Sequence, residues 1–183
     1  TALLRVPAND LNQLLLPSFN PKAKRKVLTR GLPASPGAAS GYPVFSADDA
    51  VSRTENGDSV ILVRRETSPD DIHGMHAAMG ILTSTGGTTS HAAVVARGWG
   101  KCCVAGAGQL EIDARHQLIK VGDTLVSAND IISIDGSTGE VILGDVEKRA
   151  PVFTKEFKTL MAWADKTRKM VIRTNADTPE DSK

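Results

Sequence analysis

The chain has 183 residues, 40% of them hydrophobic and 23% charged, which is the composition of one globular domain that can form a core without disulfide or metal staples. Its 22 basic residues balance 21 acidic ones and only 4% of residues are aromatic, so the composition argues against partners such as nucleic acid or an anionic membrane. No apolar run approaches the roughly 20 residues of a membrane helix, and no signal-peptide pattern opens the chain.

The two cysteines, Cys102 and Cys103, are adjacent and cannot build a disulfide framework. A reducing compartment follows, so we expect a cytoplasmic protein, with a plastid or another organelle as the alternative. The chain begins at Thr1 and ends without a capping pattern, which suggests a piece of a longer protein.

The first 41 residues contain a short helix-compatible stretch, a basic stretch and a run of small residues. Residues 11–16 are apolar, and Pro17 and Pro21 end that stretch quickly. Residues 22–26, with Arg30, are typical of a solvated connector. The small residues and helix breakers of 31–41 indicate the boundary at which an ordered domain begins.

Between residues 42 and 143 short apolar segments alternate with Gly and Asp turns, which predicts an α/β domain rich in strands. A Ser68 cap followed by Pro69 predicts a short helix running toward Ala78. A second helix is expected over residues 90–97, ended by glycines. The predicted strands cover residues 60–63, 80–83, 103–104, 118–121, 124–126, 131–134 and 140–143.

Beyond residue 150 the pattern changes. Apolar residues recur every three or four positions over residues 153–170, which predicts an amphipathic helix. Residues 171–173 then read as a strand that opens a further domain.

The densest group of chemically useful residues is the stretch 83–97. A predicted strand end leads into Gly86-Gly87, then into hydroxyl residues that include Thr89 and Ser90, and then into His91 at the start of a helix. The first turn of a helix leaves N–H groups unpaired and favours an anion, and an imidazole placed there can attack phosphorus. A capping or surface histidine explains His91 equally well, so the residues alone leave both readings open.

Other chemical patterns fail. The glycine turn lacks the Gly-Lys-Ser/Thr ending of a P-loop, residues 98–103 break the dinucleotide fingerprint, and no Gly-x-Ser-x-Gly elbow surrounds Ser90. His73 and His76 stand at helical spacing without further ligands, and His116 has no supporting neighbours, so no metal site is expected. Cys102 and Cys103 are expected to be small buried apolar residues.

Residues 86–97 resemble the phosphohistidine signature of the enzymes that interconvert phosphoenolpyruvate (PEP) and pyruvate. Supporting stretches are residues 32–39, 63–71, 74–78, 99–104, 135–139 and 173–181. The resemblance implies a swivelling β/β/α phosphohistidine domain with helical connectors at both ends. It divides the chain into a connector from a missing nucleotide-binding domain (1–29), the carrier domain (30–149), a helical connector (150–170) and the first strand of a missing PEP/pyruvate-binding α/β barrel (171–183). Hinges are then expected on both sides, around Pro17, Pro21 and Gly31 and over residues 144–151.

The resemblance also implies the roles of single residues. His91 matches the histidine that is transiently phosphorylated (tele-phosphohistidine), with Gly86, Gly87, Thr89, Ser90 and Arg97 supporting the phosphoryl site. Thr89 matches the threonine that a regulatory kinase-phosphatase modifies in some members. The full enzyme would use Mg²⁺ and a monovalent cation, neither of them bound by this chain, and would be a homodimer.

Three functions remain open. The first is the carrier of the dikinase members, which convert ATP, phosphate and pyruvate to AMP, diphosphate and PEP; this fragment alone should lack net activity. The second is the carrier of the synthase members, which transfer to water and usually have Cys where this chain has Ser90. The third is a regulatory module without the chemistry, because Thr85 and Thr88 stand where the family usually has Arg and Met.

Overall fold

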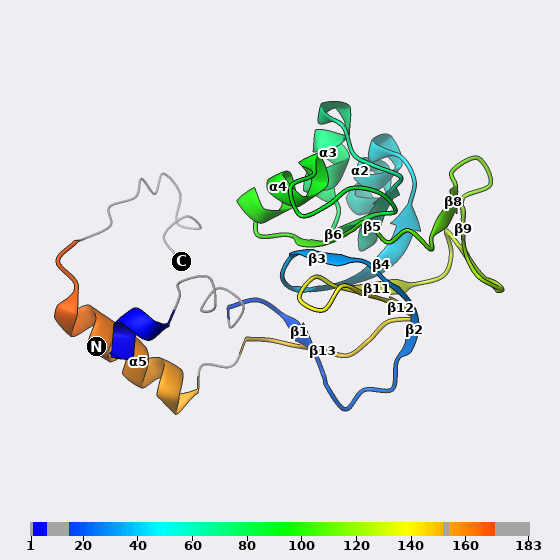
Figure 1. Cartoon of the computed structure of the whole chain (residues 1–183). Helices are drawn as coiled ribbons and strands as arrows, with labels where there is room; N and C mark the ends of the chain where they lie inside the picture. The colour runs from blue at the N-terminus through cyan, green and yellow to red at the C-terminus, as the bar shows by residue number, and fades with distance from the viewer. Residues whose placement is uncertain (1, 7–14, 152–153, 171–183) are drawn as a thin grey trace.

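The computed structural model describes residues 2–6, 15–151 and 154–170 (Figure 1). Most of the helix predicted over residues 11–16, and all of the strand predicted at 171–173, lie outside these residues. The amphipathic helix predicted over 153–170 is present as α5 (Lys155–Thr167).

The main sheet has eight strands in the order β2-β12-β11-β4-β5-β6-β7-β3. The four strands β4 to β7 are parallel to one another, and every other neighbouring pair is antiparallel. The bounds are β2 Lys26–Arg30, β3 Leu32–Ser35, β4 Ala38–Val44, β5 Val60–Arg64, β6 Gly80–Thr83, β7 Cys102–Ala105, β11 Ile132–Asp135 and β12 Glu140–Leu143.

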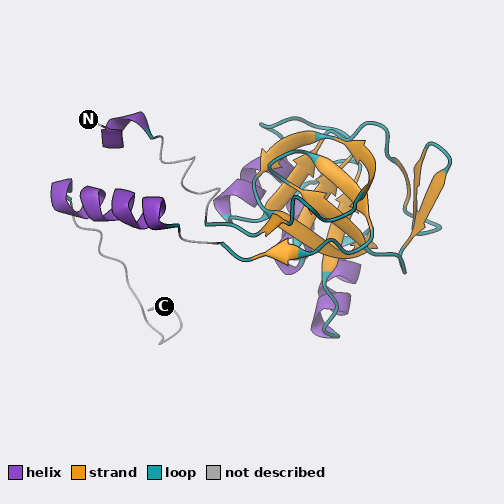
Figure 2. Cartoon of the chain, turned by 90° about the horizontal axis from the view of Figure 1, so that it is seen from below, coloured by secondary structure: helices purple, strands orange, loops and turns teal. Residues whose placement is uncertain are grey.

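The two edge strands of this sheet, β2 and β3, are joined by Gly31 alone. Because neighbouring Cα atoms are about 3.8 Å apart, the sheet must curl until its edges meet at this residue, and Figure 2 shows the strands wrapped around one another in this way. A Cβ on Gly31 would lie 2.7 Å from the Ala105 carbonyl oxygen, so only glycine fits the seam.

Helices connect the parallel strands and cover one face of the sheet (Figure 1). They are α2 (Ala47–Glu55), the 3₁₀ turn η2 (Pro69–Asp71) with α3 (Ile72–Ala77), and α4 (His91–Gly98). Gly74 of α3 packs so closely on Ala47 of α2 that a Cβ there would lie 2.4 Å from the Ala47 Cα atom. Small residues at this contact therefore let α2 and α3 pack closely against each other.

Strand β5 separates two hydrophobic cores because successive side chains of a strand point to opposite faces. Val60 and Leu62 pack in the core beneath the helices, and Ile61 and Val63 pack in the core enclosed by the curled sheet. All four side chains are fully buried, which fixes the register of the central strand.

Smaller elements extend from this body. Strands β8 (Glu111–Asp113), β9 (Leu118–Val121) and β10 (Thr124–Ser127) form a three-stranded sheet. Strands β1 (Ser18–Phe19) and β13 (Lys148–Arg149) pair with each other, so the two ends of the domain leave it side by side. The 3₁₀ turn η1 (Ala2–Arg5) contacts α5 away from the body, and α5 has no buried residue (Figures 1 and 2).

The structure confirms the α/β class, corrects two local predictions and adds one helix. The basic stretch predicted as a connector contributes strand β2, and the small-residue run at 31–41 forms β3 and most of β4 rather than a boundary. Helix α2 was not predicted. Because β2 crosses the expected domain limit at residue 30, the ordered sheet begins before that limit.

Candidate active site around His91

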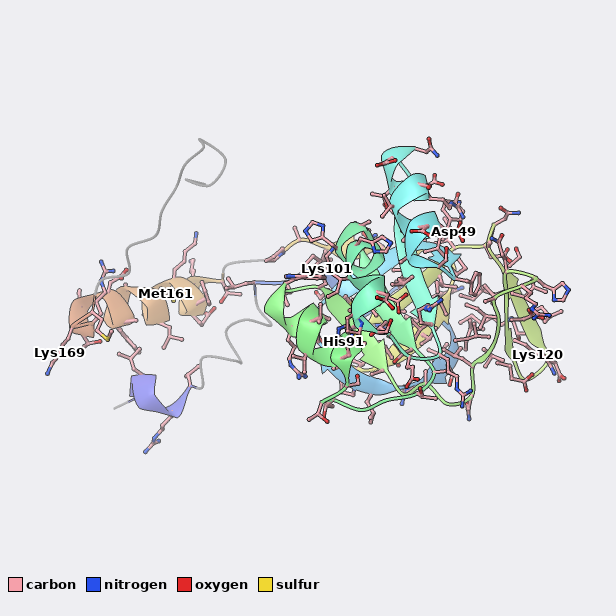
Figure 3. All side chains as sticks on the ribbon, turned by 90° about the horizontal axis from the view of Figure 1, so that it is seen from above. Asp49, His91, Lys101, Lys120, Met161 and Lys169 are labelled. Atoms are coloured by element: carbon pink, nitrogen blue, oxygen red, sulfur yellow. The ribbon has the colours of Figure 1, made fainter. Side chains whose placement is uncertain are left out.

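The candidate site lies where the parallel strands β5 and β6 end. The segment after β5 carries Thr67, and the segment after β6 carries the glycine turn that leads to His91. Loops at the carboxyl ends of parallel strands are the usual place for ligands in α/β sheets. The site belongs to the helical layer of the domain, as the position of His91 on α4 in Figure 3 shows.

His91 is the first residue of α4, and Ser90 is its N-cap. The Ser90 hydroxyl accepts a hydrogen bond from the Ala93 N–H at 3.4 Å, and the Ser90 N–H donates to the Gly87 carbonyl at 3.0 Å. These bonds confirm the helix start expected at residue 90. They place the partly exposed imidazole beside the positive end of the helix dipole.

The Nδ1 atom of His91 lies 3.0 Å from the Oγ1 atom of Thr67, which is buried and only 8% exposed. Thr67 precedes His91 by 24 residues, and sequence reasoning did not identify it as a site residue. A hydroxyl both donates and accepts, so Thr67 can hold the ring whether or not Nδ1 carries the proton. This contact leaves Nε2 as the ring nitrogen available for chemistry.

The turn before the helix depends on two glycines with positive φ. Gly86 has φ 93° and Gly106 has φ 64°, and a Cβ on Gly106 would lie 2.5 Å from the Gly86 carbonyl oxygen. Within the described part of the chain, the N–H groups of Gly87, Thr88 and Thr89 have no hydrogen-bond partner. Three unpaired N–H donors therefore lie next to the helix start, a position that favours an anion such as a phosphoryl group.

Thr85 and Thr88, the two departures from the family pattern, behave differently. The Thr85 hydroxyl donates to the Arg65 carbonyl at 2.8 Å, so it ties the glycine turn to the segment that carries Thr67. Thr88 is exposed, as is Thr89. Neither Thr85 nor Thr88 forms a hydrogen bond to His91, whose Nδ1 atom lies beside Thr67.

Arg97 is not brought to this site. It stands in the last turn of α4, about 9 Å along the helix axis from His91 at 1.5 Å per residue. Its Nη1 atom donates to the Ala34 carbonyl at 3.0 Å, so it ties α4 to strand β3. The other predicted site residues, Gly86, Gly87, Thr89 and Ser90, do lie in the turn before His91.

The remaining histidines have structural partners. His73 Nε2 lies 2.9 Å from an oxygen of Asp48, His116 Nδ1 lies 2.7 Å from an oxygen of Asp113, and the His76 ring stacks edge-on against Trp99. The His116 contact lowers the pKa of the Asp113 carboxyl. Over residues 2–6, 15–151 and 154–170, no three His, Cys, Asp or Glu side chains come together to hold a metal ion.

Both cysteines are free and buried, as expected for small apolar residues. Burial raises the pKa of the Cys103 thiol to about 12 and raises that of Cys102 further. A thiol that stays protonated is a poor nucleophile, so neither cysteine adds chemistry to the site.

No helix in the described residues is both long enough and apolar enough to cross a bilayer.

Comparison with known proteins agrees with this geometry. Residues 56–139, which include Thr67 and His91, match the family described as PEP-utilising enzyme, mobile domain. The whole chain is 51% identical to pyruvate, phosphate dikinase of Rhizobium meliloti (strain 1021), and it is 50% identical to the chloroplastic pyruvate, phosphate dikinase 1 of Arabidopsis thaliana. The Clostridium symbiosum pyruvate, phosphate dikinase is 52% identical over 99% of the chain. The chain spans only 20%, 19% and 21% of the length of these relatives. Over its whole length the chain is therefore similar to about a fifth of these dikinases, and its residues 56–139 match the mobile domain of PEP-utilising enzymes.

Proposed function

We propose that this chain is the phosphoryl-carrier part of a pyruvate, phosphate dikinase and that His91 carries the phosphoryl group on Nε2. The observation that carries the proposal is the His91 imidazole at the start of α4, held by Thr67 at Nδ1. Nε2 faces no competing partner among the described residues, and free backbone donors lie in the preceding turn.

The step that loads the histidine from PEP is a displacement at phosphorus. With the proton on Nδ1, the Nε2 lone pair attacks, the Nε2–P bond forms and the bond from phosphorus to the enol oxygen breaks. The enolate leaves and takes a proton at carbon to become pyruvate. The proton on Nδ1 stays hydrogen-bonded to Thr67 Oγ1, so the chain needs no separate base for this step.

The charge on the transferred group is met by the helix start and the glycine turn. The N–H groups of Gly87, Thr88 and Thr89, together with the dipole of α4, provide donors without requiring a side chain to move. Phosphoryl transfer depends mainly on positioning and on stabilising this charge. The N–H groups of the glycine turn would therefore stabilise the phosphoryl charge in place of the guanidinium that the family usually has at position 85.

The whole reaction requires more than this chain. The dikinase would convert ATP, phosphate and pyruvate to AMP, diphosphate and PEP, with a nucleotide-binding domain and a PEP/pyruvate-binding barrel of the same enzyme as partners. The Mg²⁺ and the monovalent cation of this reaction would be bound by those other parts. A homodimer in the cytoplasm or in a plastid completes the proposal; one relative is named as chloroplastic and others are bacterial.

The synthase alternative uses the same loaded histidine and differs in the acceptor, which is water instead of phosphate. The identity of about 50% to three dikinases favours the dikinase. A module without chemistry is disfavoured because the imidazole, its threonine partner and the glycine turn are all in place.

The proposal is tested by replacing His91 with Asn in the full-length protein that contains this chain. After incubation with ³²P-labelled PEP we expect acid-labile label on His91 of the wild type and none in His91→Asn, because Nε2 is then absent. His73→Asn is the matched control, since it removes an exposed histidine whose ring is hydrogen-bonded to Asp48. Label retained in His91→Asn would refute the carrier role, and diphosphate formation that requires phosphate separates dikinase from synthase.

We further propose that phosphorylation of Thr89 by a regulatory kinase-phosphatase switches the carrier off. The modification adds a charge of about −1.5 to −2 two residues before His91, in the turn that receives the phosphoryl group. Like charges at this distance disfavour the phosphohistidine. We expect stoichiometric Thr89 phosphorylation to abolish overall turnover, measured as PEP consumption, and unchanged turnover would contradict this role.

A further inference from the structure

A buried carboxylate stands four residues after Thr67, in the segment that links β5 to α3. Asp71 has a side chain only 7% exposed, and it does not touch His91. We propose that Asp71 is a positioning residue, which sets the hydroxyl of Thr67 against Nδ1 of His91. This inference rests on the proposed function, because it concerns how the carrier histidine is held.

The Asp71 carboxylate binds the peptide group that follows Thr67. Its Oδ2 atom accepts the Ser68 backbone N–H at 2.9 Å and lies 3.3 Å from the Ser68 hydroxyl. That N–H belongs to the peptide group that joins Thr67 to Ser68. Because a peptide group is planar and rigid, fixing its N–H fixes the direction in which the chain leaves Thr67.

Asp71 is itself held from the other side. Its Oδ1 atom lies 3.3 Å from Nη2 of Arg64, and Nη1 of the same guanidinium donates to the Phe45 carbonyl at 2.9 Å. Phe45 follows β4 directly, and Arg64 is the last residue of β5. Through Arg64, the Asp71 carboxylate is therefore attached to the ends of strands β4 and β5.

The chain is also attached to the glycine turn at Arg65, two residues before Thr67. The Arg65 carbonyl accepts the Thr85 N–H at 2.9 Å and the Thr85 hydroxyl at 2.8 Å. Thr67 thus lies between one attachment to the glycine turn and one attachment to Asp71. Within the described part of the chain its hydroxyl has His91 Nδ1 as its hydrogen-bond partner, so its place is set by the backbone on either side.

The alternative is that Asp71 only caps the short helical segment, since Ser68 and Asp71 form a capping box. The two roles make different predictions. A cap changes stability alone, whereas a positioning residue changes the rate of transfer and does so only while Thr67 has a hydroxyl to position.

The experiment is a double-mutant cycle in the full-length protein, with single-turnover labelling of His91 by ³²P-PEP as the readout. We expect Asp71→Asn to lower the maximal rate about tenfold to a hundredfold and to leave the PEP concentration for half-maximal rate unchanged. Thr67→Val should lower the rate at least as much, and Thr67→Ser should restore most of it. In the Thr67→Val background, Asp71→Asn should have no further effect. Ser46→Ala, which removes the cap of α2, is the matched control and should leave the rate unchanged.

The outcomes separate the proposed function of His91 from the positioning role of Asp71. If wild-type His91 takes no label, the proposed function fails. If the wild type is labelled and Asp71→Asn is labelled at the same rate, the positioning role alone is overturned. The same holds if Asp71→Asn slows transfer by the same factor in the wild-type and Thr67→Val backgrounds. Should Asp71→Asn fail to fold, Arg64→Lys tests the same point, because it weakens the hold on Asp71; its smaller loss of rate must also disappear with Thr67→Val.

Discussion

At the scale of single residues, the partner of the candidate nucleophile is a hydroxyl and not a carboxylate. A carboxylate at Nδ1 would favour the protonated ring and bias transfer in one direction. The Thr67 hydroxyl can donate to a bare Nδ1 or accept from a protonated one, so it costs little in either state. That property suits a histidine that must both accept and give up a phosphoryl group.

Gly106, the residue after strand β7, packs against the carbonyl of Gly86 in the glycine turn. We expect Gly106→Ala to lower the free energy of unfolding by about 1–3 kcal/mol, because φ 64° is strained for alanine and its Cβ would meet the Gly86 carbonyl. Chemical unfolding of this chain measures the change. Labelling of His91 should slow as well, since Gly86 must move.

Gly98→Ala is the control for this substitution. Nothing lies within 4 Å of a Cβ at Gly98, so its effect should stay within about 1 kcal/mol and be neutral or stabilising. Equal free energies of unfolding for Gly106→Ala and Gly98→Ala would show that the close approach of Gly106 to Gly86 does not contribute to stability.

Sequence reasoning located part of the site. His91, Ser90 and the Gly86-Gly87 turn are contiguous, so a local pattern can reveal them. Thr67 could not be found in this way, because only the pairing of β5 with β6 brings its segment beside the turn. Arg97 was included through its place in the signature, although the helix carries it away from His91.

At the scale of elements, the predictions succeeded where burial gives a simple pattern. The strand predicted over residues 60–63 is β5, and those at 80–83, 118–121 and 140–143 match β6, β9 and β12. Two of the strands that were missed, β3 and β4, contain Gly or Pro. Pro33 lies in the edge strand β3, where a missing N–H is tolerated, and Gly41 of β4 leaves room for the backbone at Ser59.

Helix α2 was missed for a different reason. Its buried residues, Ala47 and Ala50, are small, so no large apolar side chains mark this helix in the sequence. Helix α5 shows the opposite case: its period was recognised, yet none of its residues is buried. Amphipathic spacing therefore predicted a helix correctly without predicting what that helix packs against.

At the scale of the whole molecule, the two ends of the domain leave it together. Phe19 of β1 is buried against Ile142 and Val146, and the Asn20 side chain donates to the Glu147 carboxylate at 2.7 Å. A body attached through two adjacent strands can turn as one unit, which is what the proposed carrier requires. The expected hinge at Gly31 lies instead inside the closed seam of the sheet.

The whole-molecule prediction uses the two buried thiols. Their ordinary pKa is 9.0, and burial raises that of Cys103 to about 12. Above about pH 9 the unfolded chain loses thiol protons that the folded chain keeps, so the free energy of unfolding should fall as the pH rises from 8 to 10.5. Urea unfolding at each pH measures this fall.

Cys103→Ala provides the comparison, because Lys101, whose pKa is lowered by burial, opposes the trend equally in both proteins. The fall should be smaller in the variant, and an aromatic disulfide reagent should modify wild-type thiols only after unfolding. Rapid modification of the native protein, or an identical pH dependence in the variant, would contradict the buried state of the thiols.

The α/β class, most central strands and the histidine with its glycine turn follow from the amino-acid sequence, because these features depend on neighbours along the chain. The tertiary structure alone decided the closure of the sheet at Gly31, the place of Thr67 beside His91 and the removal of Arg97 from the site. Each of these joins residues from different strands or turns of the fold, and a local pattern carries no information on which segments a curled sheet brings together.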